Sequence, residues 1–196
     1  MLSGCVKEQP YQNKKSNMID LYLYFVKHHP IISSAVQVGI LGTCGEILAG
    51  KIRLGRWYLF GPGPVRLIEK IIIWAFLGIT FKYAFTGFFG FVDAITLKGY
   101  WFKVVNDNLF LKALSVSTFT NLIYGPVMML FHRWTDNWIE KKQMDWTSLQ
   151  NAWKTLIWFW IPAHTLTFSL PSHLQVGLAA VWAVALGIIL GFFARR

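Results

Sequence analysis

The stretch LQVGLAAVWAVALGIILGFF, residues 174–193, decides the fold of this chain. It runs for about twenty residues without Asp, Glu, Lys or Arg, which is the length an α-helix needs to cross the hydrocarbon core of a bilayer. Gly187 and Gly191 lie about one turn apart on the same face, where small residues let a second helix approach closely. Arg195 and Arg196 follow as a positive flank. The stretch therefore predicts a membrane-spanning helix.

The composition of the whole chain agrees with this prediction. Of its 196 residues, 55% are hydrophobic and 14% are charged, against about 25% charged residues in an average soluble domain. Ten Trp and sixteen Phe bring the aromatic content to 17%, and Trp in particular gathers at bilayer interfaces. The period-two alternation of a membrane β-barrel does not recur. We expect an all-α integral membrane protein that forms a single transmembrane domain over residues 1–196.

Apolar segments earlier in the chain predict a bundle of four to five transmembrane helices. The Gly-Pro repeat at residues 61–64 is too dense in breakers for a regular element. Pro126 and Pro162 are expected to interrupt their helices, and residues 132–151 are polar enough to form a loop or helical extension in water. The expected spans are 31–49, 65–97, 109–131, 152–170 and 174–193, preceded by a polar extension (1–17) and a short interfacial amphipathic helix (18–29).

The net charge of +10 is spread between apolar runs and forms no block of the nucleic-acid-binding type. We therefore expect no nucleic-acid partner. The densest basic segment is predicted to contact anionic lipid headgroups or an acidic partner, because basic segments next to membrane helices attract both. Its residues are Lys51, Arg53, Arg56, Arg66 and Lys70. No cofactor is expected, although bound phospholipids such as cardiolipin would suit this segment.

The first predicted span contains small residues and one charge. Gly39 and Gly42 are expected, with Gly187 and Gly191, to form helix-packing faces. Glu46 is the single charged residue, and an ionisable group at membrane depth costs on the order of 2.5 to 3.5 kcal/mol without a partner or water. Two interpretations stay open: Glu46 lines an aqueous cavity, or it pairs near a helix end with a loop cation such as Lys51.

Other ionisable groups within apolar segments suggest a polar path through the bundle. Lys82 and Asp93 are about three turns apart, so they fall roughly on one face of a helix. A Lys82 side chain that snorkels to the interface explains its position equally well. The candidate path consists of Glu46, Lys82, Asp93, Asp107 and His164.

Recognisable catalytic or metal-binding motifs are missing from the sequence. The five His residues show neither HxxxH nor HExxH spacing, so we expect no metal site. The sequence has no GxSxG nucleophile elbow and no phosphate-cradling glycine loop. Cys5 and Cys44 suggest neither a disulfide framework nor a zinc site. We therefore expect a protein that is not an enzyme.

Short motifs distributed from Leu21 to Trp182 give the chain a family resemblance. The first half carries Tyr22-Leu23, Pro30, Gly45-Glu46 and Lys103 followed by Asp107-Asn108, and the second carries Asp145 to Leu149, Ala152-Trp153, Trp160, Pro162, His164, Thr167, Phe168 and Pro171. This series resembles the Mpv-seventeen and twenty-two-kilodalton peroxisomal membrane protein family. The resemblance implies a four-span protein of the mitochondrial inner membrane or the peroxisome that acts as a small-solute pore.

The chain departs from the family pattern at several positions. Lys82-Tyr83, Thr86 and Phe88-Phe89 replace the family's Gly-Pro, His and Trp-Tyr, while His164 and Thr167 replace a Gln and an Asn. From the missing catalytic residues and the aromatic-rich helices, we expect an accessory subunit of a larger complex in the mitochondrial inner membrane, of the respiratory-chain or ATP synthase type. Its partners would be lipids and other membrane subunits. The alternative is a small-solute channel of the mitochondrial inner membrane or the peroxisomal membrane.

Overall fold

The computed structural model describes residues 17–57 and 64–193, and every regular element within them is a helix. Four helical stretches are long and apolar enough to cross a membrane, which confirms the predicted all-α membrane bundle. The predicted polar extension falls outside the described residues except for Asn17. The elements are α1 (Met18–His28), α2 (Pro30–Leu54), α3 (Val65–Leu97), α4 (Val104–Asp107), α5 (Leu109–Phe119), η1 (Thr120–Tyr124), α6 (Gly125–Glu140), α7 (Trp146–Thr155), η2 (Leu156–Trp160), α8 (Ile161–Phe168) and α9 (Ser172–Phe193).

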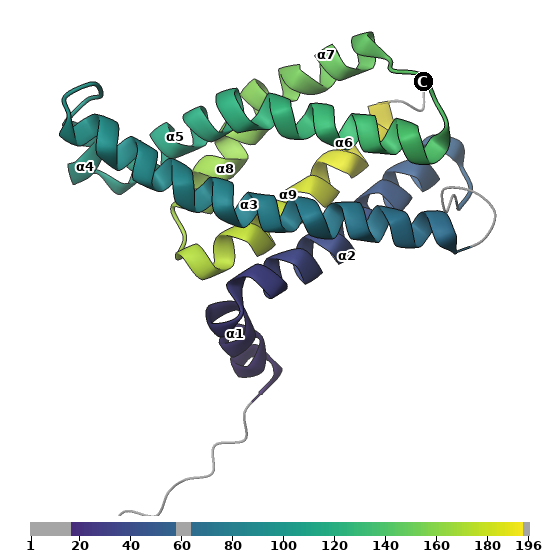
Figure 1. Ribbon diagram of the computed structural model, residues 1–196, viewed down its shortest axis with the longest axis horizontal. Coiled ribbons are helices and arrows are strands. Elements are labelled where there is room, and N and C mark those ends of the chain that lie inside the picture. Colours follow the sequence, from purple (N-terminus) through teal and green to yellow (C-terminus); the bar gives the residue numbers. More distant parts are fainter. Residues whose placement is uncertain (1–16, 58–63, 194–196) are drawn as a thin grey trace, which may run out of the picture.

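The helices form rods that run back and forth between two ends of the bundle (Figure 1). α3 returns antiparallel to α2, the α5–η1–α6 rod runs antiparallel to α3, and the α7–η2–α8 rod returns beside it. α9 then runs parallel to α2, because Gly45 lies beside Gly187 and Ala49 beside Gly191. The α7–η2–α8 rod is not among the four apolar spans, yet it connects the end that holds Ser148 with the end that holds Phe168. It corresponds to the predicted span 152–170, the fourth in chain order.

The four glycines predicted to pack helices all lie at helix contacts. A Cβ on Gly39 would meet Ala75 of α3 at 3.3 Å, and one on Gly42 would enter the Trp74 ring. A Cβ on Gly187 would lie 3.2 Å from the carbonyl oxygen of Gly45, and one on Gly191 would lie 3.2 Å from that of Ala49. The glycines therefore let the α2 backbone approach both α3 and α9, as close packing in lipid requires.

Each predicted proline interruption is a π-helical turn. η1 ends immediately before Gly125-Pro126, and η2 ends immediately before Ile161-Pro162. Proline has no N–H to continue the α-helical ladder, and a π-bulge is one way to absorb the lost bond without a chain break. Both rods therefore stay continuous through the bundle.

Three predicted boundaries differ from the structure by more than two residues. α2 continues past Ala49 to Leu54 and ends at Gly55, whose φ of 70° is the left-handed conformation typical of a helix C-terminus. α6 continues to Glu140, so the first part of the segment expected in water is the end of a membrane rod. α7 begins at Trp146 because Asp145 caps it by accepting a hydrogen bond from the Ser148 N–H.

α1 projects from the bundle beside the start of α2 (Figure 1). Asn17 and Asp20 form a capping box that fixes where this helix begins. The Tyr22 hydroxyl donates to Gln37 at 2.9 Å and ties α1 to α2. Met18 and Leu21 remain largely exposed, whereas Val26 is buried.

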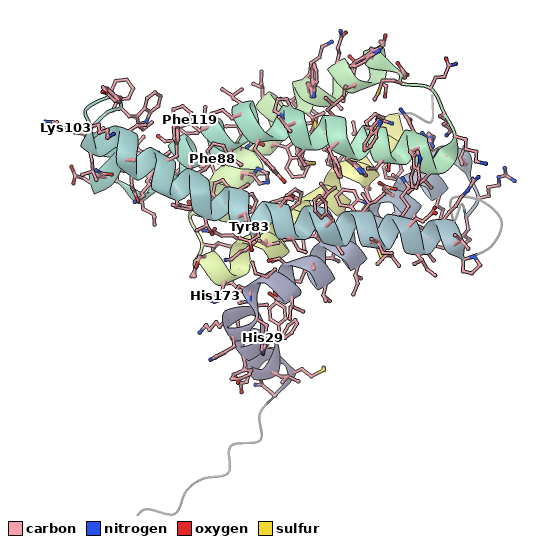
Figure 2. The ribbon with its side chains drawn as sticks, viewed as in Figure 1. His29, Tyr83, Phe88, Lys103, Phe119 and His173 are labelled. Atoms are coloured by element: carbon pink, nitrogen blue, oxygen red, sulfur yellow. The ribbon has the colours of Figure 1, made fainter. Side chains whose placement is uncertain are left out.

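α3 extends well beyond the start of α2 and of α9. Gly78 contacts Ser34 of α2, and the Lys82 ammonium reaches the carbonyl oxygen of Ser172, the first residue of α9. The rest of α3, the loop with α4, and the beginning of α5 form a hairpin past these points, with Lys103 at its tip and Phe88 and Phe119 between its helices (Figure 2). We call residues 91–111 the projection.

Candidate functional site

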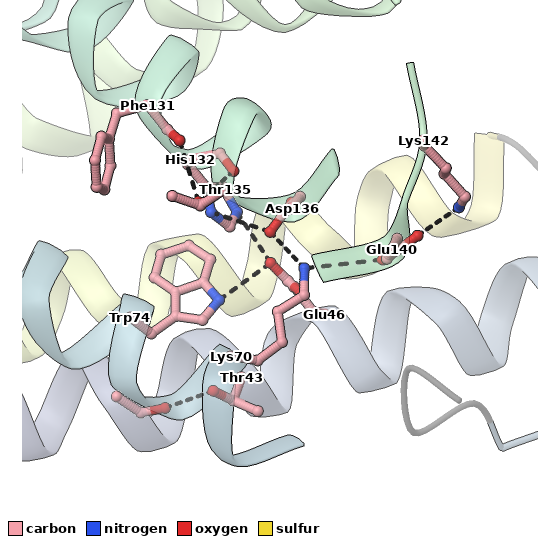
Figure 3. Close-up of polar contacts among 11 residues, drawn as sticks. Thr43, Glu46, Lys70, Trp74, Phe131, His132, Thr135, Asp136, Glu140 and Lys142 are labelled. Carbon is pink, nitrogen blue, oxygen red and sulfur yellow. Dashed lines mark hydrogen bonds and ion pairs between the residues drawn. The ribbon is translucent and has the colours of Figure 1, made fainter. Parts of the chain in front are cut away.

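The described residues bring five ionisable side chains from three helices together inside the bundle. Lys70 of α3 lies at the centre and is only 1% exposed. Its ammonium lies 3.0 Å from Glu46 Oε2 of α2, donates to Asp136 of α6, and lies 3.9 Å from Glu140 Oε1. One buried cation thus pairs with three carboxylates. His132 of α6 completes the group, which we call the ionic cluster (Figure 3).

Glu46 receives two further polar contacts from the ionic cluster and its neighbour Trp74. His132 Nε2 lies 2.9 Å from Glu46 Oε1, and the Trp74 indole N–H donates to the same oxygen at 3.1 Å. The Trp74 and His132 rings pack together with their centroids 4.4 Å apart. Because these partners come from α3 and α6, Glu46 connects three helices.

Helical periodicity places these side chains on facing sides of the rods. Lys70 and Trp74 are four residues apart on α3, and His132, Asp136 and Glu140 recur at the same interval on α6. Residues at this interval share one helix face. The expectation that His132 and Asp136 lie in water is therefore corrected, because this face packs against α2 and α3.

The ionic cluster contains a set of potential metal ligands. Glu46, His132 and Asp136 each offer a ligand atom, and these atoms lie within 4.8 Å of one another. The sequence spacing gave no indication of this group, since Glu46 is distant in the chain. The Lys70 ammonium contacts both carboxylates and supplies the positive charge that a metal ion would bring.

A polar cavity of about 460 Å³ opens beside the ionic cluster. Part of its lining consists of small and apolar residues of α2 and α9, including Gly50, Gly187 and Gly191. Its remaining walls carry both signs of charge. The polar lining consists of Glu46, Arg53, Lys70, His132, Arg133, Asp136, Asn137, Glu140, Lys142 and Ser148.

A second, smaller cavity of about 50 Å³ lies deeper in the bundle, and its walls are mainly aromatic and aliphatic. Trp74 lines it and also contacts Glu46 and His132, so the indole stands between the two cavities. The second cavity contains a buried hydrogen-bonded pair, Asn121 and His164, whose side chains are 3.1 Å apart. The cavities are therefore separate chambers in this structure.

The predicted polar path is distributed over several places. Glu46 lines the polar cavity and His164 the deeper one. Asp93 pairs with Lys112 of α5 at 2.6 Å, whereas Lys82 contacts Ser172 of α9. Asp93 and Lys82 therefore bind different helices. Asp107 lies on α4 in the projection. The structure does not bring the five residues together.

The predicted basic segment is also divided. Arg53 lines the polar cavity, while Lys70 belongs to the ionic cluster. Lys51 lies over the Trp57 ring, with its ammonium 3.7 Å from the ring centroid. Arg56 follows α2 on the exposed surface, and Arg66 is in the first turn of α3. The sequence analysis did not identify Trp74, His132, Asp136 or Glu140 as site residues. Their four-residue spacing from one another or from Lys70 was the available signal.

Comparison with known proteins adds no family assignment. No protein-family model matches the chain, and no curated protein or solved structure matches it. The resemblance described from the sequence therefore stays a prediction.

Proposed function

We propose that this protein is a non-catalytic accessory subunit of a larger membrane complex, which it stabilises through helix packing and lipid contacts. The observation that carries the proposal is the projection. Val92 and Val105 are buried within it, but several other apolar side chains of the projection are exposed past the ends of α2 and α9, among them Leu97 at 80%, Tyr100 at 77% and Phe102 at 68%. Exposed apolar patches of this kind mark interaction sites.

The length of α3 supports a protein partner for the projection. At 1.5 Å per residue, its 33 residues span roughly 50 Å, whereas the hydrocarbon core is about 30 Å thick. Part of the hairpin therefore extends beyond the layer that α2 and α9 span. Outside that layer, apolar side chains such as Leu97 and Phe102 would be exposed to water unless another subunit packs against them.

The pairing of charges supports a structural role for the ionisable residues. Glu46, Asp136 and Glu140 each have a Lys partner, and Asp93 has Lys112. These pairs connect α2, α3, α5 and α6, so they join helices within the bundle. The resemblance implies either the mitochondrial inner membrane or the peroxisome, and we propose the mitochondrial inner membrane as the location, with the peroxisomal membrane as the alternative.

The test compares two triple variants in native membranes. Leu97→Ala, Tyr100→Ala and Phe102→Ala together remove the projection's exposed side chains, and Ile68→Ala, Ile72→Ala and Phe76→Ala remove exposed residues elsewhere on α3. Truncation of a hot-spot side chain near the centre of an interface costs about 2 kcal/mol or more. We expect the first set to reduce co-migration with the complex on native gels of mild-detergent extracts by about tenfold or more.

The control set is expected to leave co-migration within about twofold of the parent. Mass spectrometry of the high-mass band would identify the partner, and separate mitochondrial and peroxisomal fractions would identify the organelle. A parent protein that migrates alone at monomer size in both fractions contradicts the proposal. Equal losses in the two triple variants would contradict the role of the projection.

A small-solute channel is the second candidate, and the polar cavity is the observation that favours it. The cavity reaches Glu46 and Lys70, and Trp74, which donates a hydrogen bond to Glu46, lines the deeper chamber. Planar-bilayer recording of the purified protein tests this function. If solutes pass this point, Trp74→Ala is expected to raise conductance several-fold, whereas Trp138→Ala, an exposed tryptophan of α6, leaves it unchanged. Absence of conductance in all three proteins would exclude the channel.

A further inference from the structure

The charges around the polar cavity are not evenly matched. Its three carboxylates already have partners, because Glu46 and Asp136 bind Lys70, and Glu140 binds Lys142. Two cations in the lining remain. Arg53 has no carboxylate partner among the described residues, and Arg133 has none either, since its guanidinium donates only to the Ser148 hydroxyl at 3.3 Å.

The two arginines line one cavity from different helices, Arg53 on α2 and Arg133 on α6. Arginine presents several N–H donors in a planar fork that suits phosphate oxygens. Ser148 and Asn137 add neutral polar groups to the cavity lining. A cavity of about 460 Å³ has room for a phosphate together with the groups attached to it.

The cavity lies where the rods end. α2 stops at Leu54 close to Arg53, and α6 stops at Glu140. Trp134, Trp138 and Trp146 are exposed on the neighbouring helices, and tryptophan is enriched at the level of lipid headgroups. Basic pockets between membrane helices at this level bind phosphate-bearing headgroups.

We propose that Arg53 and Arg133 bind a phosphate group in this cavity. The phosphate is that of an anionic phospholipid headgroup or of a free phosphorylated solute, and the same two guanidinium groups would recognise either. Lys70 does not bind the phosphate, because its ammonium already pairs with three carboxylates. This site is separate from the projection, so it does not depend on the proposed partner.

The test uses full-length protein purified in detergent and two double variants of equal charge. Arg53→Gln with Arg133→Gln removes the cavity cations, whereas Lys141→Gln with Lys154→Gln removes two exposed lysines that do not line the cavity. The probes are phosphatidylglycerol, phosphatidylcholine and inorganic phosphate. Native mass spectrometry measures the bound probe, and thermal unfolding confirms that each variant is folded.

We expect the cavity variant to bind the recognised probe at least tenfold more weakly than the parent, and the control variant to stay within about twofold. Binding of phosphatidylglycerol without inorganic phosphate assigns the site to a lipid headgroup. Binding of inorganic phosphate with the same arginine dependence assigns it to a soluble phosphate. The proposal is overturned if no probe binds, if phosphatidylcholine binds as tightly as phosphatidylglycerol while inorganic phosphate does not bind, or if both variants lose binding equally.

Discussion

Replacing Lys70 with Met is expected to destabilise the bundle strongly. The variant leaves Glu46 and Asp136 without their shared cation in a site where the parent Lys70 is only 1% exposed. Removing one partner of a buried ion pair typically costs about 3–5 kcal/mol, because an uncompensated charge remains. For a chain of this length we expect the midpoint of thermal unfolding to fall by roughly 10 °C.

Two companion variants distinguish lost pairing from lost packing. Lys51→Met removes an exposed lysine from the same end of the bundle and is expected to change the midpoint by no more than about 2 °C. The triple variant Lys70→Met, Glu46→Gln and Asp136→Asn removes all three charges and is expected to recover most of the loss, since neutral replacements for a buried ion network are often tolerated. A triple variant as unstable as Lys70→Met would show that the ion pairs are not the cause.

Gly78→Leu is expected to have the next largest effect on stability after Lys70→Met. A Cβ at this position would lie 2.9 Å from the carbonyl carbon of Ser34, and closer still to its oxygen. Both atoms belong to the α2 backbone, so a side chain fits only if α2 and α3 move apart. Overpacking of this kind costs about 1–3 kcal/mol, and a clash with backbone lies at the upper end of that range.

Gly87→Leu provides the matched control on the same helix. Nothing lies within 4 Å of a Cβ at Gly87, and leucine has a better helix propensity than glycine. We expect this variant to keep or raise the unfolding midpoint in detergent, while Gly78→Leu lowers it by roughly 5 °C or more. If the two variants unfold at the same temperature, close contact between α2 and α3 at Gly78 is not required.

The apolar pattern was sufficient to predict the helices and much of their extent. α3 begins and ends where the sequence predicts, and α1 ends one residue earlier than predicted, because polar or breaker residues bound their apolar runs on both sides. The predicted boundaries are wrong where charged residues lie within a helix that packs inside the bundle. The end of α6 carries enough charged residues to suggest a loop in water, but His132, Asp136 and Glu140 recur every four residues and form one face that packs inward.

The ionic cluster could not be assembled from the sequence because its members lie far apart in the chain. Glu46 had a nearer candidate partner in Lys51, yet Lys51 lies on the Trp57 ring and Lys70 binds Glu46. Which cation reaches a carboxylate depends on how two helices cross. That crossing is set in turn by contacts such as those of Gly39 and Gly78.

The sequence by itself determined that the chain lies in a lipid bilayer and that it is helical. Long apolar runs can satisfy their backbone hydrogen bonds in lipid only as helices. Only the tertiary structure decided which charges meet, where the polar cavity opens, and that α3 extends past its neighbours. Those features depend on the register between helices, which close contacts at small residues set and hydropathy does not record.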